Sequence, residues 1–557
     1  MRTRTRRSLA AAVVVIALLS STQSTAQRES GTDSQRVIVV FRSATLPSDA
    51  DARVSRAGGT VIAHLDEVGV LIAAPSPQAR SNFLSRLRAD AAILAAEDDQ
   101  LIDFPRPAAV ATEPFSIEPD THSPHPAPFA PLPADYFYTS TSQQWAVKRV
   151  GAQGGGIAGG GAGAWDTTRG AGTTIAILDT GVNTVHPDIA PNLVFSAALT
   201  SDNPAAFGTP NCEVPDPANP PFDLPIDQMG HGSWTSSLAA AAAGPGTGLL
   251  IGVAPQAHIL NIKVLRNRPA TAAELKMLGV PDTPFNRCLF RTASGLVSWV
   301  LQGILLANAQ GADVISMSLG AGIPRNIQGG GGAAIWSAFN RVLNFVTSNG
   351  SVIVAAAGNV ATDLDSARSI VAVPADSPGA IAVTATTNPA LLPPTPPERQ
   401  PCQAGEDCLA SYSNYGTSLH GVAAPGGDLP AGGCTLAGVC VPTGFLRGAC
   451  AAGVPGTIAP SSAGYPATGP PPAGTSWGCF NSTTPHAWYV QATGTSGSTP
   501  LAGGVLALIK SVNPTLSPQQ MARILQHTAE DIGKVGYDEL FNFGLVNATA
   551  AVAAAAR

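Results

Sequence analysis

The sequence predicts an α/β fold in which a mostly parallel, doubly wound sheet has helices on both faces. Five strand candidates after residue 172 are apolar along their length, among them TTIAILD at 173–179, HILNIKVL at 258–265 and SVIVAAA at 351–357. Strands that are apolar on both faces are typical of parallel sheets buried between helices. Helical patterns at 293–309 and 334–347 alternate with the strands, as an α/β architecture requires.

A small ferredoxin-like α+β module is expected before this domain, in residues 27–104. The pattern predicts a strand at 36–42 (RVIVVFR), a short helix at 49–56 and two strands on either side of 67–69. It then predicts a helix at 77–89 and a last strand in AAILAAEDD. The resulting order β-α-β-β-α-β is the ferredoxin-like one. Residues 105–142 contain many prolines and no helical or strand period, which favours an extended linker.

The composition indicates a globular protein with no nucleic-acid partner. Of 557 residues, 45% are hydrophobic and 12% are charged, which supports a sizeable core. The formal net charge is −6, and Lys and Arg do not cluster after the first few residues. A nucleic-acid-binding surface would require such a basic cluster.

Residues 1–26 have the pattern of a secretory signal peptide. Four arginines precede an apolar run from Leu9 to Leu19, and small residues at Ser24 and Ala26 favour cleavage after Ala26. The apolar run is too short to span about 30 Å of hydrocarbon. Arg6-Arg7 leaves both the Sec and the twin-arginine route open. We expect a secreted protein, extracellular or periplasmic, with no membrane segment in its mature form.

Export gives the eight cysteines a structural meaning. An even number in an oxidising compartment predicts four disulfides, although their pairing cannot be deduced from spacing. No CxxC pair occurs, and the spacings are too wide for zinc knuckles. Six of the cysteines lie between 402 and 479, a Gly/Pro/Ser-rich stretch where disulfides would compensate for weak local structure.

Three polar residues lie where predicted elements begin or end. Asp179 ends the strand at 173–179, His231 begins an Ala-rich helical run, and Ser496 lies in a glycine-rich turn before an apolar helix. Serine becomes a nucleophile when a neighbouring base takes its proton, and a histidine oriented by a buried carboxylate can be that base. Each residue alone has an ordinary structural explanation, as a turn, a helix start or a helix cap. Their order along the chain, Asp then His then Ser, is that of subtilisin.

Residues 143–557 resemble the catalytic domain of subtilisin-family (subtilase) serine proteases. The resemblance rests on ILDTGVNTVHPDI, GHGSW and GTSGSTP, with VISMSLG and VIVAAAGN between them in family order. It implies a secreted endopeptidase in which Asp179 orients His231, His231 acts as general base and then acid, and Ser496 attacks the scissile carbonyl. It implies that Asn359 completes the oxyanion hole.

The same resemblance implies substrates, an inhibitor and a metal ligand. Ser318, Leu319 and Gly320 match the segment that pairs with the substrate backbone, and the substrates are proteins or peptides. The module at 27–104 resembles the family's propeptide, an intramolecular inhibitor that is removed by cleavage within 105–142, and the mature enzyme is expected to be a monomer. The chemistry needs no cofactor. Asp188 matches a frequent calcium ligand, although the loop at 240–255 lacks the asparagine that usually completes that structural site.

The sequence departs from the family pattern in two motifs and two insertions. Thr235 and Ser236 replace apolar residues in the helix after the histidine, so the local packing must differ. Gly497 and Ser498 stand where Met-Ala is usual, so we expect a more exposed and looser turn without an oxidisable methionine. Insertions near 196–226 and 402–479 exceed a minimal subtilase and are expected to flank the cleft.

Three other functions remain as alternatives. An aspartic peptidase needs two paired carboxylates, but DTG occurs once. An esterase would carry G-x-S-x-G, which does not surround Ser496. The third alternative is an exported subtilase homologue that has lost catalytic activity and acts as a binding protein.

Overall fold

The computed structural model describes fifteen parts of the chain. They are residues 36–103, 144–153, 162–200, 212–213, 223–243, 250–277, 280–289, 291–324, 332–367, 369–389, 402, 405–428, 446–450, 480–481 and 487–557. The predicted signal peptide and the predicted linker at 105–142 lie outside the described residues, as do large parts of both predicted insertions. None of the described helices combines the length and the hydrophobicity that crossing a bilayer would require.

The largest sheet among these residues is parallel and has seven strands, in the order β16-β15-β13-β11-β6-β8-β7. The strands are β16 (Val422–Pro425), β15 (Ala380–Thr386), β13 (Val352–Ala356), β11 (Val314–Met317), β6 (Thr174–Asp179), β8 (His258–Lys263) and β7 (Leu193–Ala198). All five strands predicted from apolar runs are confirmed. The α/β doubly wound fold is therefore the observed one.

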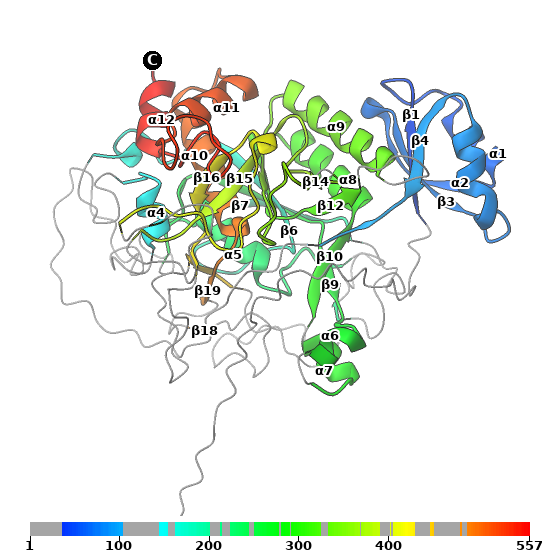
Figure 1. The fold of residues 1–557 in the computed structure, drawn as a ribbon, viewed down its shortest axis with the longest axis horizontal. Coiled ribbons are helices and arrows are strands. Elements are labelled where there is room, and N and C mark those ends of the chain that lie inside the picture. The colour runs from blue at the N-terminus through cyan, green and yellow to red at the C-terminus, as the bar shows by residue number, and fades with distance from the viewer. Residues whose placement is uncertain are drawn as a thin grey trace, which may run out of the picture.

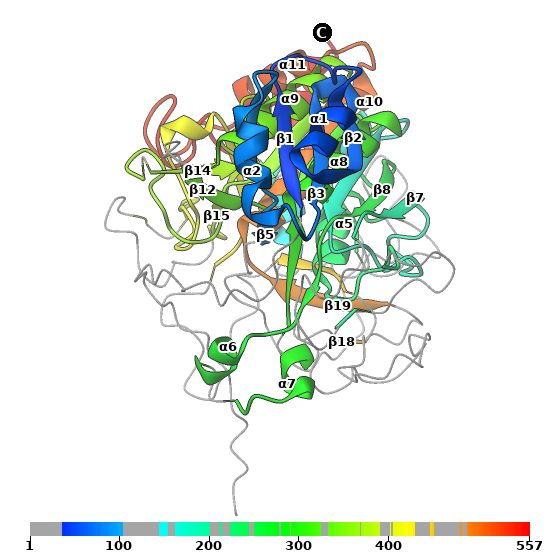
Figure 2. The same ribbon diagram turned by 90° about the vertical axis from the view of Figure 1, so that its right-hand side faces the viewer.

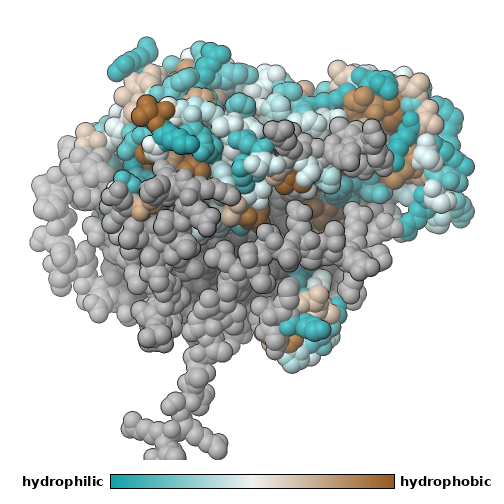
Figure 3. Space-filling view, in the orientation of Figure 1, coloured by the Kyte–Doolittle hydropathy of each residue, from teal (hydrophilic) through white to brown (hydrophobic). Residues whose placement is uncertain are grey.

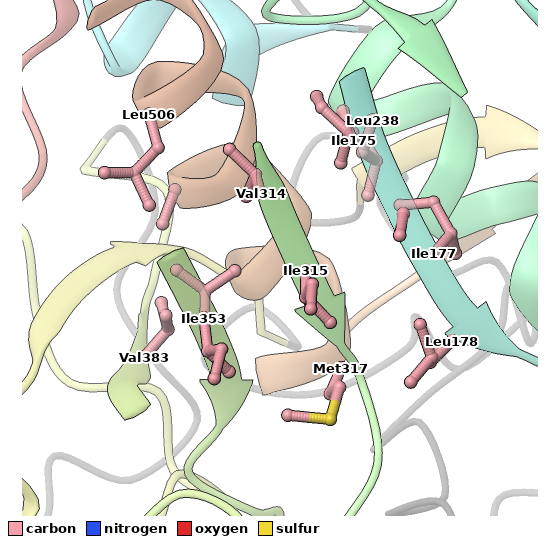
Figure 4. Packing of buried hydrophobic residues seen from close by; sticks show 14 of the residues in the cluster. Ile175, Ile177, Leu178, Leu238, Val314, Ile315, Met317, Ile353, Val383 and Leu506 are labelled. Atoms are coloured by element: carbon pink, nitrogen blue, oxygen red, sulfur yellow. The ribbon is translucent and has the colours of Figure 1, made fainter. Parts of the chain in front are cut away.

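Helices cover both faces of this sheet. They are α5 (His231–Ala240), α8 (Val297–Ala309), α9 (Ala333–Ser348), α10 (Thr495–Val512) and α11 (Pro518–His527). Helix α12 (Ala548–Ala555) packs on α10 and α11, and the short helix α4 (Trp145–Arg149) precedes β6 in the chain. Helix α10 packs on one face, where Leu506 lies over the side chains of β11 and β13 (Figure 4). Helix α8 packs on the other, where Gly303 lies close to Leu178 and Val264. Strand side chains alternate between the two layers and are buried in both.

One predicted helix begins later than its pattern suggested. The pattern at 293–309 indicated a single helix, but Thr292–Leu296 forms strand β10 and α8 begins at Val297. Strand β10 pairs antiparallel with β9 (Arg266–Arg268) and with β5 (Leu101–Asp103). Between β9 and β10 the chain forms α6 (Ala272–Met277) and α7 (Pro284–Leu289), which extend below the main body in Figure 1.

The predicted N-terminal module has the expected order of elements. They are β1 (Val37–Phe41), α1 (Ala50–Ala57), β2 (Gly59–Leu65), β3 (Val70–Pro75), α2 (Arg80–Ala89) and β4 (Ile93–Asp98), in an antiparallel sheet ordered β2-β3-β1-β4. Alternate residues of β1 face opposite layers: Val37 and Val39 pack under the module's own helices, whereas Ile38 and Val40 join the core shared with the main domain. Figures 1 and 2 show this sheet standing beside α8 and α9.

Smaller sheets and disulfides complete the described fold. The sheets pair β12 (Ala321–Pro324) with β14 (Ile370–Val373), and β19 (Trp488–Ala492) with both β17 (Leu446–Ala449) and β18 (Phe480–Asn481). Disulfides join Cys212 to Cys288 and Cys402 to Cys408, and Cys450 is also disulfide-bonded. On the face seen in Figure 3, hydrophobic residues of the described parts form small separate areas.

Candidate active site

Three of the predicted site residues lie at the carboxyl ends of neighbouring strands. Asp179 is the last residue of β6, Ser318 follows β11, and Asn359 lies just after β13. These strands are adjacent and parallel in the sheet. Because parallel strands end at the same edge, the sheet brings the three residues to one side of the molecule.

Asp179 and His231 form a buried pair. His231 is the first residue of α5, and its Nδ1 lies 2.6 Å from Asp179 Oδ1. The backbone N–H of Thr180 donates to the same oxygen at 2.7 Å, and the Thr235 hydroxyl donates to Asp179 Oδ2 at 3.2 Å. Both members of the pair are buried. A carboxylate in such surroundings requires donors on its oxygens, and these donors also fix its orientation toward the imidazole.

Glycines let the aspartate turn and the histidine helix approach one another. Gly181 has φ +99°, and a Cβ there would lie 2.6 Å from the backbone of Ile226. A Cβ on Gly232 would collide with the carbonyl oxygen of Gly181. The first turn of α5 therefore rests directly on the backbone that follows Asp179.

Asp227 is a buried residue of this region that the sequence did not single out. Its Oδ1 accepts hydrogen bonds from the Thr180 hydroxyl (2.9 Å) and from the N–H groups of Met229 (2.9 Å) and Gly230 (2.8 Å). Its Oδ2 accepts from Ser233 N (2.9 Å) and Oγ (2.7 Å). Burial raises the pKa of Asp227, and these hydrogen bonds oppose that rise. An acidic residue shortly before a helix start is a capping signal that could have indicated this role.

Ser496 and Asn359 are held by the start of α10. Ser496 is the second residue of that helix; its carbonyl accepts from the Ser318 hydroxyl at 2.9 Å, and its hydroxyl lies 3.4 Å from the Ser318 carbonyl. Asn359 Oδ1 accepts from the N–H (2.9 Å) and the hydroxyl (2.8 Å) of Thr495. Because Oδ1 is engaged in this way, Nδ2 is the donor end of the Asn359 amide. A helix N-terminus beside a directed amide donor favours a developing oxyanion.

The remaining residues of the predicted substrate segment lie next to Ser318. Leu319 is buried and Gly320 is half-buried, and together they connect β11 to β12. The structure thus brings Ser318 into contact with Ser496, whereas Leu319 contributes to the core.

Trp234 explains the glycine at position 497. Its ring lies 6.0 Å from that of His231, and its Nε1 donates to the Leu446 carbonyl at 3.1 Å. A Cβ on Gly497 would lie only 2.9 Å from the indole, and a Cβ on Gly448 would overlap it. The expectation that Gly497 exposes the turn is wrong: the residue is buried within α10 because the indole of α5 fills the space of its missing side chain.

Asp188 is fully buried. The Tyr489 hydroxyl donates to Asp188 Oδ2 at 3.0 Å, and His186 Nδ1 lies 3.7 Å from the same oxygen. Among the described residues no group of three or more His, Cys, Asp and Glu side chains lies together in a way that could hold a metal. The expectation that Asp188 binds calcium stays a prediction.

Buried charges lie behind the loop that precedes His231. Lys263, which is opposite Asp179 in the β6–β8 register, lies 3.3 Å from Glu213 and donates to the Ile226 carbonyl at 3.2 Å. Arg266 lies 3.4 Å from Asp223, and burial raises the pKa of Asp223 to about 6. Because Glu213 is adjacent to Cys212, the disulfide to Cys288 holds this acidic partner in place.

Comparison with known proteins gives a consistent result. The model of the subtilase family, Peptidase_S8, matches residues 170–544. Thermitase of Thermoactinomyces vulgaris is 28% identical over 389 residues, which is 70% of this chain and 91% of thermitase. An extracellular protease of Xanthomonas campestris pv. campestris is 27% identical over 414 residues, covering 70% of this chain and 53% of that protein.

The overall fold also resembles solved structures. The epidermin leader peptide processing serine protease of Staphylococcus aureus superposes with a TM-score of 0.61 at 18% identity, covering 94% of this chain and 98% of that one. At this level of identity the likeness concerns the fold.

Proposed function

Because the chain belongs to the subtilase family, we propose that it is a secreted serine endopeptidase that hydrolyses peptide bonds through Asp179, His231 and Ser496. The observation that carries this proposal is the buried contact of 2.6 Å between His231 Nδ1 and Asp179 Oδ1. Export is supported by the N-terminal sequence and by the extracellular relative, and protein or peptide substrates are supported by the protease relatives.

In the proposed mechanism the two ring nitrogens of His231 have separate tasks. Nδ1 faces Asp179, which fixes the tautomer and stabilises the imidazolium. Nε2 takes the proton of Ser496 as its hydroxyl attacks the scissile carbonyl, and later returns it to the leaving amine. Water then hydrolyses the acyl-enzyme by the same route in reverse.

The oxyanion of each tetrahedral intermediate would be bound by Asn359 and by the backbone N–H of Ser496. The double contact with Thr495 keeps Asn359 Oδ1 engaged and leaves Nδ2 as the donor end. A fixed donor pays no reorganisation energy when charge develops, which is why preorganised donors are effective.

Substrate binding by strand addition is supported by β10. Strand β5 of the N-terminal module pairs antiparallel with β10, with Gly295 opposite Ile102. This pairing supports the proposal that β10 forms one edge of the substrate-binding site. Ser318–Gly320 would supply the second edge. Main-chain pairing of this kind gives affinity with little dependence on substrate sequence.

The N-terminal module would act as an intramolecular inhibitor, because its strand β5 pairs with β10 and so takes the place that a substrate strand would use. Two of its carboxylates also cap helices of the main domain. Glu97 accepts from the N–H groups of residues 332–334 at the start of α9, and Asp99 accepts from Ser298 N (3.1 Å) and Oγ (2.5 Å) at the start of α8. Cleavage within 105–142 would release it, leaving a monomeric enzyme.

The test compares the wild-type precursor with Ser496→Ala. We expect wild type to mature and to react with a fluorophosphonate, whereas the variant stays full length and unlabelled. A second variant, Ser498→Ala, keeps the predicted nucleophile and should both mature and label. A wild-type chain that neither matures nor labels would instead indicate the lapsed, binding homologue. Activity that persists at acidic pH after serine reagents would indicate aspartic chemistry.

A further inference from the structure

Thr235 contacts the carboxylate that orients His231. It lies one helical turn after His231 on α5, so both side chains project toward the same side of the helix. Its side chain is fully buried, and its hydroxyl lies 3.2 Å from Asp179 Oδ2. Asp179 is therefore held by one helix at two points, with His231 on one oxygen and Thr235 on the other.

The Thr235 hydroxyl has two acceptors within reach, and the surroundings favour the carboxylate. The Gly232 carbonyl is also 3.2 Å away. However, Ser236 Oγ already donates to that carbonyl at 2.6 Å. An ionised acceptor attracts a hydroxyl proton more strongly than a carbonyl that already has a donor. The two polar residues that depart from the family pattern thus act together: Ser236 satisfies the helix carbonyl, and Thr235 is left for Asp179.

We propose that Thr235 is a positioning residue of the triad, which donates a hydrogen bond to Asp179 and so limits how strongly that carboxylate holds the protonated form of His231. The inference rests on the proposed function, because it concerns the same aspartate and histidine. A donor on Oδ2 stabilises the negative charge of Asp179 and makes it a weaker partner for the imidazolium. Thr235 also keeps the carboxylate plane fixed, so that Oδ1 stays directed at His231.

The other charged groups around the pair would be unchanged by loss of this hydroxyl. Asp227 accepts hydrogen bonds from the hydroxyls of Thr180 and Ser233, and the Lys263 amine on β8 lies 3.3 Å from Glu213. Within the described residues, neither the carboxylates of Asp227 and Glu213 nor the amine of Lys263 forms a hydrogen bond with Thr235, whose hydroxyl contacts Asp179 and the Gly232 carbonyl. A shift in the pH dependence of the variant would therefore come from Asp179.

The experiment uses the full chain with Thr235→Val, which keeps the shape and removes the hydroxyl, and Thr235→Ser, which restores it. The pH profile of kcat/KM is measured with a chromogenic peptide. We expect Thr235→Val to move the acidic limb upward by about half to one pH unit, because His231 keeps its proton to higher pH. Its plateau kcat should fall about tenfold with KM little changed, and Thr235→Ser should recover most of both.

A matched control removes a buried threonine hydroxyl that does not touch the pair. Thr499 donates to the Thr495 carbonyl within α10 at 2.8 Å, so Thr499→Val should leave the pH profile in place. If Thr235→Val does not yield mature enzyme, the titration midpoint of the His231 ring is followed by NMR in the Ser496→Ala precursor with and without Thr235→Val. There too the midpoint should rise.

The outcomes separate this proposal from the proposed function. An unshifted acidic limb in Thr235→Val, or equal defects in the Val and Ser variants, would overturn the role of the hydroxyl while leaving the triad intact. A wild-type chain that fails to react with a fluorophosphonate would overturn the proposed function. In that event an unchanged His231 midpoint on Thr235→Val substitution would overturn the present proposal as well, and a raised one would support it.

Discussion

Glu97 should determine how tightly the N-terminal module is held. Its Oε1 accepts from the N–H groups of Gly332 (2.8 Å) and Ala333 (3.2 Å), and its Oε2 accepts from Ala334 N (3.0 Å). The side chain is buried between the two units. The perturbation is Glu97→Gln, which keeps the volume but removes the charge and turns one acceptor into a donor that faces an N–H group.

The expected magnitude follows from the two interactions that are lost. Loss of a helix-capping acceptor costs about 0.5–2 kcal/mol, and loss of a charge at a partly buried helix N-terminus costs up to about 2 kcal/mol. A combined loss of about 2 kcal/mol corresponds to a change of about 30-fold in the opening equilibrium of the module.

The assay is amide hydrogen exchange on the Ser496→Ala precursor, which cannot cleave itself if the proposed nucleophile is correct. Amides of β10 and of the first turn of α9 should exchange about 30-fold faster in Glu97→Gln, since the module must detach before they reach solvent. The control is Asp98→Asn, which changes the exposed neighbouring carboxylate on β4. Equal exchange in the two variants would refute the reasoning.

Three further outcomes are expected. Burial raises the pKa of Asp99 from 3.8 to about 6. The folded precursor therefore keeps a proton on Asp99 that the unfolded chain has lost, and its free energy of unfolding should fall by about 3 kcal/mol as the pH rises from about 4 to 6. Urea titrations of the Ser496→Ala precursor should show this pH dependence, and Asp99→Asn should remove it. Asn359→Leu should lower kcat about 10²–10³-fold with little change in KM, and an unaffected kcat would argue against its oxyanion role. Glu213→Gln should lower the free energy of unfolding by about 3–5 kcal/mol, since it leaves Lys263 buried without its anion, and adding Lys263→Met should recover most of that loss.

The sequence predicted the parts of the fold whose burial is uniform. TTIAILD and its companions are apolar on both faces, and such runs form the centre of a parallel sheet whatever surrounds them. TASGL at 292–296 carries no such pattern, because β10 owes its form to pairing with β5, almost two hundred residues earlier in the chain. The helix predicted from local periodicity therefore began too early, because pairing with distant strands makes residues 292–296 a strand.

Within the candidate site, motifs located the residues but not their surroundings. The spacing of Asp179, His231 and Ser496 does not reveal that Asp227 ties the first two motifs together, because its partners are mostly backbone N–H groups. For Thr235 the sequence indicated only a change in local packing. The role of a buried hydroxyl depends on its hydrogen-bond acceptor, which the sequence does not identify. Disulfide pairing was likewise beyond the sequence, because it depends on which loops meet in space.

The indole of Trp234, fitted against Gly497 and Gly448, makes substitutions at these three positions interdependent. A Cβ at either glycine would meet the ring, so a methionine at position 497 would need a smaller residue in place of Trp234. The effects of substitutions at contacting positions are generally not additive. A variant designed to carry methionine at position 497 should therefore change Trp234 at the same time.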